Sequence, residues 1–389
     1  MLSDLSRFLK VDTEKQALID DILNPPVVFH SKKHVLRAPE FDFSADLYEA
    51  DACYSLAEPD TKFCPQCNRK YPEEENVCYD CLVALKPLSD RIPIEDIKAN
   101  PSFKVNGANR YADFKTILTE ENVEIIDEFA FNLKDYRKII RNIKLSSLRC
   151  LDDMIKDNYV DMNDINILEK VLLFTKSFVD VDYKSYGREL GYYESQTITV
   201  DDRQTDCLQI TTLIHELSHF ILNEIITEVL CKLLDCERTP IVEVIAAHIL
   251  SCSNFACLID EYSAHCCEGR FTVYGYQDYS SFLNIIQEMD GEMTADEIEI
   301  TKSIGNTFAN SIKGILESFI DRDLLRDIKK EFLRYHVENP NYEMLKLENC
   351  QVLTGEGFLR AIWLIVVDGF KSAVMNRESL EKYYNGDNI

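Results

Sequence analysis

The sequence contains no apolar run long enough to cross a lipid bilayer. Its most apolar stretch, AIWLIVV at residues 361–367, is far shorter than the roughly twenty residues that a membrane-spanning helix needs. The opening segment, MLSDLSRFLK, lacks the apolar core of a secretory signal. We therefore expect a cytoplasmic protein without a membrane segment.

Basic residues are scarce relative to acidic ones. The chain has 42 Lys and Arg against 68 Asp and Glu, which gives a formal charge of −26. Unspecific nucleic-acid binding depends on Lys and Arg displacing the counterions of phosphates, so this charge disfavours a nucleic-acid partner. Apolar residues make up 46% of the sequence, which is ordinary for a folded globular protein.

The fourteen cysteines do not indicate a disulfide framework, because such frameworks belong to short secreted chains. Four of them form the pairs CPQC and CYDC, and these residues are Cys64, Cys67, Cys78 and Cys81. Two CxxC pairs supply four thiolates, which close a tetrahedral shell around zinc and leave no open position for chemistry. We predict a structural zinc ribbon here. It lacks a basic face, so a protein partner is favoured over nucleic acid.

The segment HELSH indicates a second metal site. His215 and His219 are four residues apart, so an α-helix places both imidazoles on one face, where they can bind one ion. Glu216 would lie beside that ion and act as a general base towards a water molecule. The surrounding pattern predicts a strand at 190–202 and helices at 205–234, 242–257 and 258–268.

Zinc hydrolases usually have three protein ligands and one position for water, so a third ligand is needed. The metzincin arrangement is excluded, because Leu222 and Ile225 stand where that class has Gly and His. Glu261, in the helical segment LIDEYSAH, is the favoured ligand. His265, one turn beyond on the same face, and His248, on the apolar helix VIAAHILS, remain alternatives.

HELSH followed by a helix with DEYSAH resembles the gluzincin group of metallopeptidases, and the core is similar to its ImmA/IrrE-like members. The resemblance covers about residues 190–271. It implies a zincin-like fold, a zinc ion held by His215, His219 and Glu261, and hydrolysis of peptide bonds. His265 departs from the pattern, since the group often has an acidic residue at that position.

The sequence thus predicts a mostly helical α+β protein with a small sheet. Residues 1–60 form an N-terminal segment of unknown role, 61–88 the zinc ribbon, 89–290 the zincin-like domain and 291–389 a helical C-terminal region. The predicted function is a zinc metallopeptidase with one catalytic and one structural Zn²⁺, acting on a protein or peptide substrate. The alternative is a non-catalytic zinc protein that recognises a partner through its ribbon.

Overall fold

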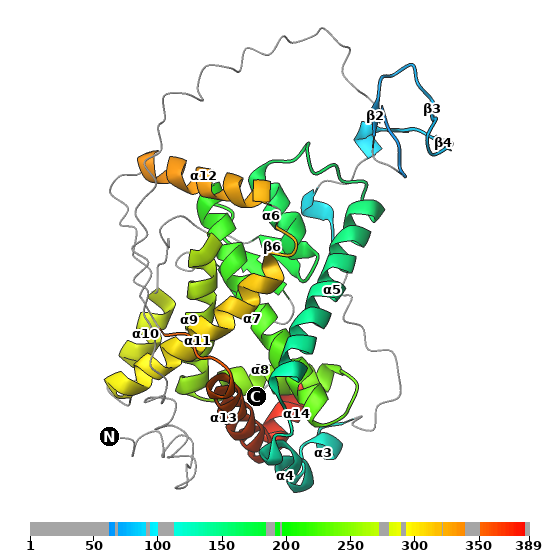
Figure 1. The fold of residues 1–389 in the computed structure, drawn as a ribbon. Coiled ribbons are helices and arrows are strands. Elements are labelled where there is room, and N and C mark those ends of the chain that lie inside the picture. Colours follow the sequence, from blue (N-terminus) through cyan, green and yellow to red (C-terminus); the bar gives the residue numbers. More distant parts are fainter. Residues whose placement is uncertain are drawn as a thin grey trace.

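Helices dominate the described part of the protein, where three small sheets accompany them (Figure 1). The predicted class, α+β and mostly helical, is therefore confirmed. The structure is a computed structural model that describes residues 62–66, 69–90, 94–99, 113–183, 191–194, 197–271, 280–288, 293–320, 322–338 and 351–385.

Residues 62–90, called the ribbon below, contain five very short strands. The first sheet has the order β2-β1-β5, and β3 pairs with β4 in a separate hairpin. The bounds are β1 Lys62–Phe63, β2 Lys70–Tyr71, β3 Val77–Cys78, β4 Val83–Ala84 and β5 Lys86–Pro87. Two 3₁₀ turns follow, at Leu88–Asp90 and Ile94–Asp96.

One side of the ribbon rests against the helical body. Lys70 forms an ion pair with Asp164. The ring of Phe63 lies 5.5 Å from that of Tyr159, and the Lys86 ammonium lies over the same tyrosine at 5.1 Å. These contacts fix which side of the ribbon faces the body.

The helices of the body are α3 Phe114–Ile117, α4 Glu120–Glu128, α5 Leu133–Asp157, α6 Ile167–Lys176, α7 Asp206–Leu233, α8 Pro240–Ser251, α9 Asn254–Phe271, α10 Ser280–Glu288, α11 Ala295–Leu316, α12 Arg322–Glu338, α13 Glu356–Met375 and α14 Arg377–Tyr384. A single hydrophobic core runs through them from Ile94 to Ala373. The boundary predicted at residue 290 therefore does not separate two cores, since α11 packs on α9 and α13 on α8. The buried ribbon residues Phe63, Cys64 and Cys78 lie outside this core.

A three-stranded sheet, in the order β6-β8-β7, precedes the central helix α7. Its strands are β6 Asp180–Tyr183, β7 Gly191–Glu194 and β8 Thr197–Val200. The sequence predicted a single strand over 190–202, and this was wrong: β7 and β8 are two antiparallel strands. Partial alternation of apolar residues does not reveal a reversal of the chain within such a short segment.

β7 lies close against α7. A β-carbon added at Gly191 would meet Thr212 Cγ2 at 2.4 Å and the Thr199 carbonyl oxygen at 2.6 Å. Only glycine permits this approach between strand and helix. The contact on α7 falls one turn before His215.

α7 is the buried centre of the fold, as Figure 1 shows. The predicted helix, 205–234, is confirmed within one residue at each end. Most of its residues are buried, as expected of a helix that is packed on several sides. After its end, Arg238 forms an ion pair with Glu224, whose side chain is fully buried, and a second one with Glu243 at 2.6 Å.

α8 and α9 follow. α8 ends at Ser251, earlier than the predicted helix end at residue 257, and α9 begins at Asn254. The Ser253 hydroxyl accepts a hydrogen bond from the Ala256 amide at 3.2 Å and so caps the start of α9. α11 holds α9 closely, because a β-carbon at Gly305 would lie 2.9 Å from the Ile259 carbonyl oxygen. This close packing fixes the segment of α9 that carries Asp260 and Glu261.

Within the part of the chain that the structure describes, no single helix is both long and apolar enough to cross a bilayer. α8 and α9 meet the criterion only when taken together, across a bend of 97°.

Candidate metal centre

His215 and His219 lie one helical turn apart on α7, with their rings turned towards the same point. Their Nε2 atoms are 3.2 Å apart, and their ring centroids are 5.0 Å apart. A tetrahedral ion with nitrogen ligands at about 2.0–2.1 Å holds two such atoms about 3.3–3.4 Å apart. The spacing of the two imidazoles therefore suits a single metal ion.

Glu261 on α9 completes the group. Its Oε2 lies 3.7 Å from His215 Nε2, and its Oε1 lies 3.8 Å from His219 Nε2. All three ligand atoms lie within 4.8 Å of one another, so they could hold one ion. The structure thus brings together the three residues predicted as ligands, while metal binding itself stays a prediction.

The Nδ1 atom of each imidazole, on the side of the ring away from the other histidine, faces a carboxylate. His215 Nδ1 lies 3.2 Å from Glu268 Oε2, and His219 Nδ1 lies 2.9 Å from Asp260 Oδ1. A carboxylate at Nδ1 holds the ring in place and keeps the proton on that nitrogen, which leaves the Nε2 lone pair for an ion. The arrangement of both rings fits a metal between the Nε2 atoms.

The alternative ligands occupy other positions. His265 packs its ring 4.5 Å from that of His215, and its Nδ1 lies 3.8 Å from Glu268 Oε2. His248 on α8 faces α13, where its Nε2 lies 3.1 Å from the Ser372 hydroxyl. Within the described residues, His248 is not part of any group of side chains that could hold a metal ion.

His215, His265 and Glu268 form a second group that could hold an ion, on the Nδ1 side of His215. The side chains of His265 and Glu268 are both only 4% exposed, whereas Glu261 is 22% exposed. A catalytic metal needs an open position for water and substrate. The group with Glu261 is therefore the better candidate for chemistry.

Four carboxylates lie around the two histidines, and their negative charge raises the pKa of both imidazoles. They belong to Glu216, Asp260, Glu261 and Glu268. Burial alone would lower the pKa of His215, but the nearby carboxylates of Glu261 and Glu268 outweigh burial and hold this pKa well above its usual value. Burial likewise opposes protonation of His219, yet Asp260 raises the pKa of that ring to about 9. The site therefore favours positive charge, either as protons on the rings or as a metal cation.

Glu216 lies next to this group and is 8% exposed. Burial raises the pKa of its carboxyl, while the imidazoles of His215 and His219 oppose that shift without cancelling it. A buried carboxyl beside a metal group can accept and return a proton.

Three of the four predicted ribbon ligands converge, since the sulfur atoms of Cys64, Cys78 and Cys81 lie within 4.8 Å of one another. Cys67 lies outside the described residues. The Tyr71 hydroxyl donates a hydrogen bond to Cys78 Sγ at 3.0 Å, and this bond lowers the pKa of the Cys78 thiol to about 6. The same contact raises the pKa of Tyr71 to about 12. A thiol that ionises easily suits a metal ligand.

Sequence reasoning missed the two carboxylates at the Nδ1 atoms. Glu268 follows Glu261 by seven residues, which is two helical turns, so helical periodicity placed it on the same face. Asp260, the residue before Glu261, lies beside His219 Nδ1. A search of the helix beyond one turn would have found Glu268.

No protein-family model, curated protein or solved structure matches this chain. Conclusions about its chemistry therefore rest on the geometry of its own residues.

Proposed function

We propose that this protein is a zinc-dependent metallopeptidase, with a zincin-like core of the gluzincin type. One observation carries the proposal: two imidazole nitrogens and a carboxylate from two packed helices converge on one point, with Glu216 beside them. The small sheet directly before α7 and the uninterrupted helix around HELSH support it. The fold class alone would not, because one fold serves many functions.

His215, His219 and Glu261 would hold the zinc ion. When bound, zinc supplies Lewis acidity towards the scissile carbonyl. Glu216 takes a proton from the attacking water, the water oxygen adds to the carbonyl carbon, and the carbon–nitrogen bond breaks. Glu216 then returns the proton to the leaving amine. Asp260 and Glu268 keep both imidazoles oriented throughout.

Removal of the metal tests this function. The full chain, purified and loaded with zinc, is expected to cleave fluorescein-labelled casein or members of a mixed peptide library. Treatment with 1,10-phenanthroline is expected to reduce the cleavage rate to background, and added Zn²⁺ to restore it, because the site loses its Lewis acid. Product formation is followed by fluorescence and mass spectrometry.

The His219→Ala variant is the control, because added zinc should not restore its activity. Cleavage that survives chelation would contradict the proposal. Zinc retained in the site without cleavage of any peptide would instead favour the non-catalytic zinc protein.

A further inference from the structure

The ribbon exposes the two most solvent-accessible large hydrophobic side chains among the described residues. Leu82 is 80% exposed and Tyr79 is 72% exposed, and Val77 nearby is 40% exposed. All three belong to the β3–β4 hairpin and are called the ribbon knob below. Single exposed apolar residues are common, but three within six positions of one small hairpin form a patch.

The backbone of Leu82 gives a second, independent observation. Its φ is +56°, in the left-handed region that leucine adopts only at an energetic cost, and its amide donates to the Cys78 carbonyl oxygen at 2.7 Å. Glycine would adopt this conformation without that cost. Neither the backbone nor the solvent exposure favours leucine here, so the stability of the ribbon does not explain it.

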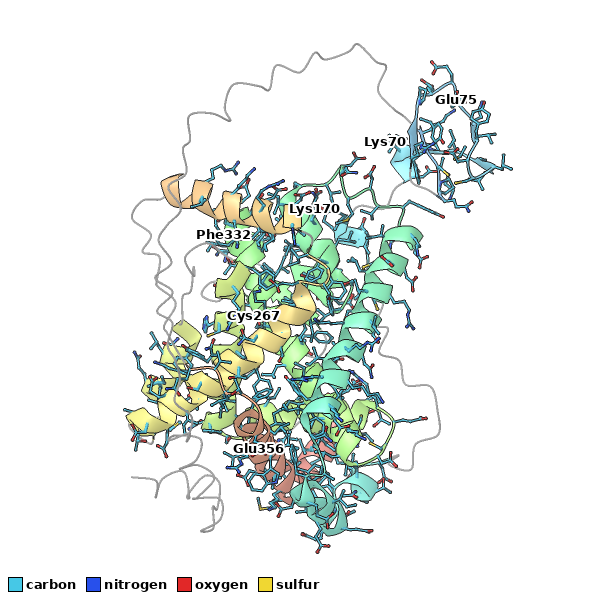
Figure 2. All side chains as sticks on the ribbon, viewed as in Figure 1. Lys70, Glu75, Lys170, Cys267, Phe332 and Glu356 are labelled. Atoms are coloured by element: carbon cyan, nitrogen blue, oxygen red, sulfur yellow. The ribbon has the colours of Figure 1, made fainter. Side chains whose placement is uncertain are left out.

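The hairpin that carries the knob lies on the side of the ribbon away from the helical body (Figure 1). Lys70, Phe63 and Lys86 contact the body from β2, β1 and β5. β3 and β4 lie on the far side of the ribbon in Figure 1. Figure 2 shows Glu75 at the outer end, whereas Lys70 lies on the side nearer the helices. The knob is thus presented to solvent and to other molecules.

Acidic residues outnumber basic ones in the sequence around the knob, and each described ribbon cation has a partner. Glu73 and Glu74 are exposed, and Glu75 follows them. The Lys62 ammonium donates to the carbonyl oxygens of Glu73 and Glu75 and to the Asn76 side chain, while Lys70 and Lys86 face the body. Arg69 forms an ion pair with Asp80, between Tyr79 and Leu82, so the three glutamates and Asp80 face only two nearby cations among the described ribbon residues. The electrostatic potential beside the knob is therefore set mainly by carboxylates.

We propose that the ribbon knob is a docking site for a protein segment that carries an apolar or aromatic side chain flanked by Lys or Arg. The apolar side chain would pack against Tyr79 and Leu82, and the basic residues would face Glu73, Glu74 and Glu75. The overall charge of −26 favours the same basic partner. This inference goes beyond hydrolysis and does not depend on it.

Fluorescence anisotropy with defined peptides tests the proposal. The probes are short labelled peptides with a Leu, Phe or Trp core, flanked by Lys and Arg, by Gly and Ser, or by Asp and Glu. The protein is the full chain with Glu216→Gln, so that any hydrolysis cannot destroy the probes. Basic-flanked peptides are expected to bind at least about tenfold more tightly than acidic-flanked ones, and less tightly as salt rises.

Leu82→Gly separates recognition from folding. It is expected to weaken binding of the basic-flanked peptides about tenfold while the melting temperature stays unchanged or rises, because glycine relieves the left-handed backbone. Tyr79→Ser should weaken binding similarly with the ribbon zinc retained. Leu145→Ser, at a 49% exposed position on α5, is the matched control and should bind as the parent does.

Three results would overturn the proposal. The first is equal binding of basic- and acidic-flanked peptides. The second is binding that survives both Leu82→Gly and Tyr79→Ser. The third is sedimentation that shows a dimer of the full chain which Leu82→Gly dissociates, since a second copy would then cover the knob.

Discussion

Replacing Glu216 by Gln is expected to slow hydrolysis of labelled casein by about 10²- to 10⁴-fold, the usual contribution of a positioned general acid–base group. Gln has nearly the same shape as Glu but cannot take the proton of the attacking water. Glu216 lies beside His215 and His219 but is not one of the three proposed zinc ligands, so the zinc content should not change. The rate and the zinc content are measured on the same preparation.

Glu228→Gln is the matched control, because Glu228 lies on the same helix. Its carboxylate is 29% exposed and lies 3.9 Å from Arg238, away from the histidines. This variant should cleave casein at the parent rate. If Glu216→Gln retains full activity with zinc bound, the hydrolytic mechanism is wrong.

Replacing His215 by Ala is expected to reduce the zinc content from about two ions per chain to about one. The loss removes one nitrogen ligand and leaves Glu261 and Glu268 without the imidazole between them. Zinc that binds the folded site and not the unfolded chain would stabilise the fold, so its loss is expected to lower the free energy of unfolding, by about 4 kcal/mol at zinc concentrations 1,000-fold above Kd. Elemental analysis and denaturant titration measure the two effects.

Cys78→Ser should show the converse result, with the ribbon zinc lost and the zinc of α7 and α9 retained. His248→Ala is the control for His215→Ala, because His248 faces Ser372 rather than the site. It should keep both ions. A His215→Ala variant with unchanged zinc content would show that the ion lies elsewhere or is absent.

Local periodicity was enough to predict α7 and the relation between its two histidines. The helix was predicted at 205–234 and runs from Asp206 to Leu233. Because residues four apart share a face of any α-helix, the juxtaposition of His215 and His219 requires no knowledge of the tertiary fold. This part of the site is encoded within five consecutive residues.

The position of Glu261 depended on tertiary packing that the sequence does not display. Its residue type and helical setting made it a candidate, but it reaches His215 and His219 only because α9 packs on α7. The close contact at Gly305 that holds α9 joins residues more than forty positions apart. The sequence pattern within a single helix does not predict a contact of this kind between two helices.

The errors have the same origin. β7 and β8 are two very short antiparallel strands, and the Ser253 hydroxyl caps the start of α9. A periodic pattern read over about ten residues does not resolve features of this size. The boundary at residue 290 stays a prediction, although one hydrophobic core includes residues on both sides of it. Long-range burial decides domain limits, and a single sequence shows it only indirectly.

The most direct test of the central claim is an anomalous-difference map from crystals of the protein, recorded at the zinc absorption edge. The predicted result is a peak at about 2.0–2.2 Å from His215 Nε2, His219 Nε2 and a carboxylate oxygen of Glu261. A peak on the Nδ1 side of His215, between His265 and Glu268, would contradict the claim. So would the absence of any peak within coordinating distance of the two histidines in crystals grown with zinc.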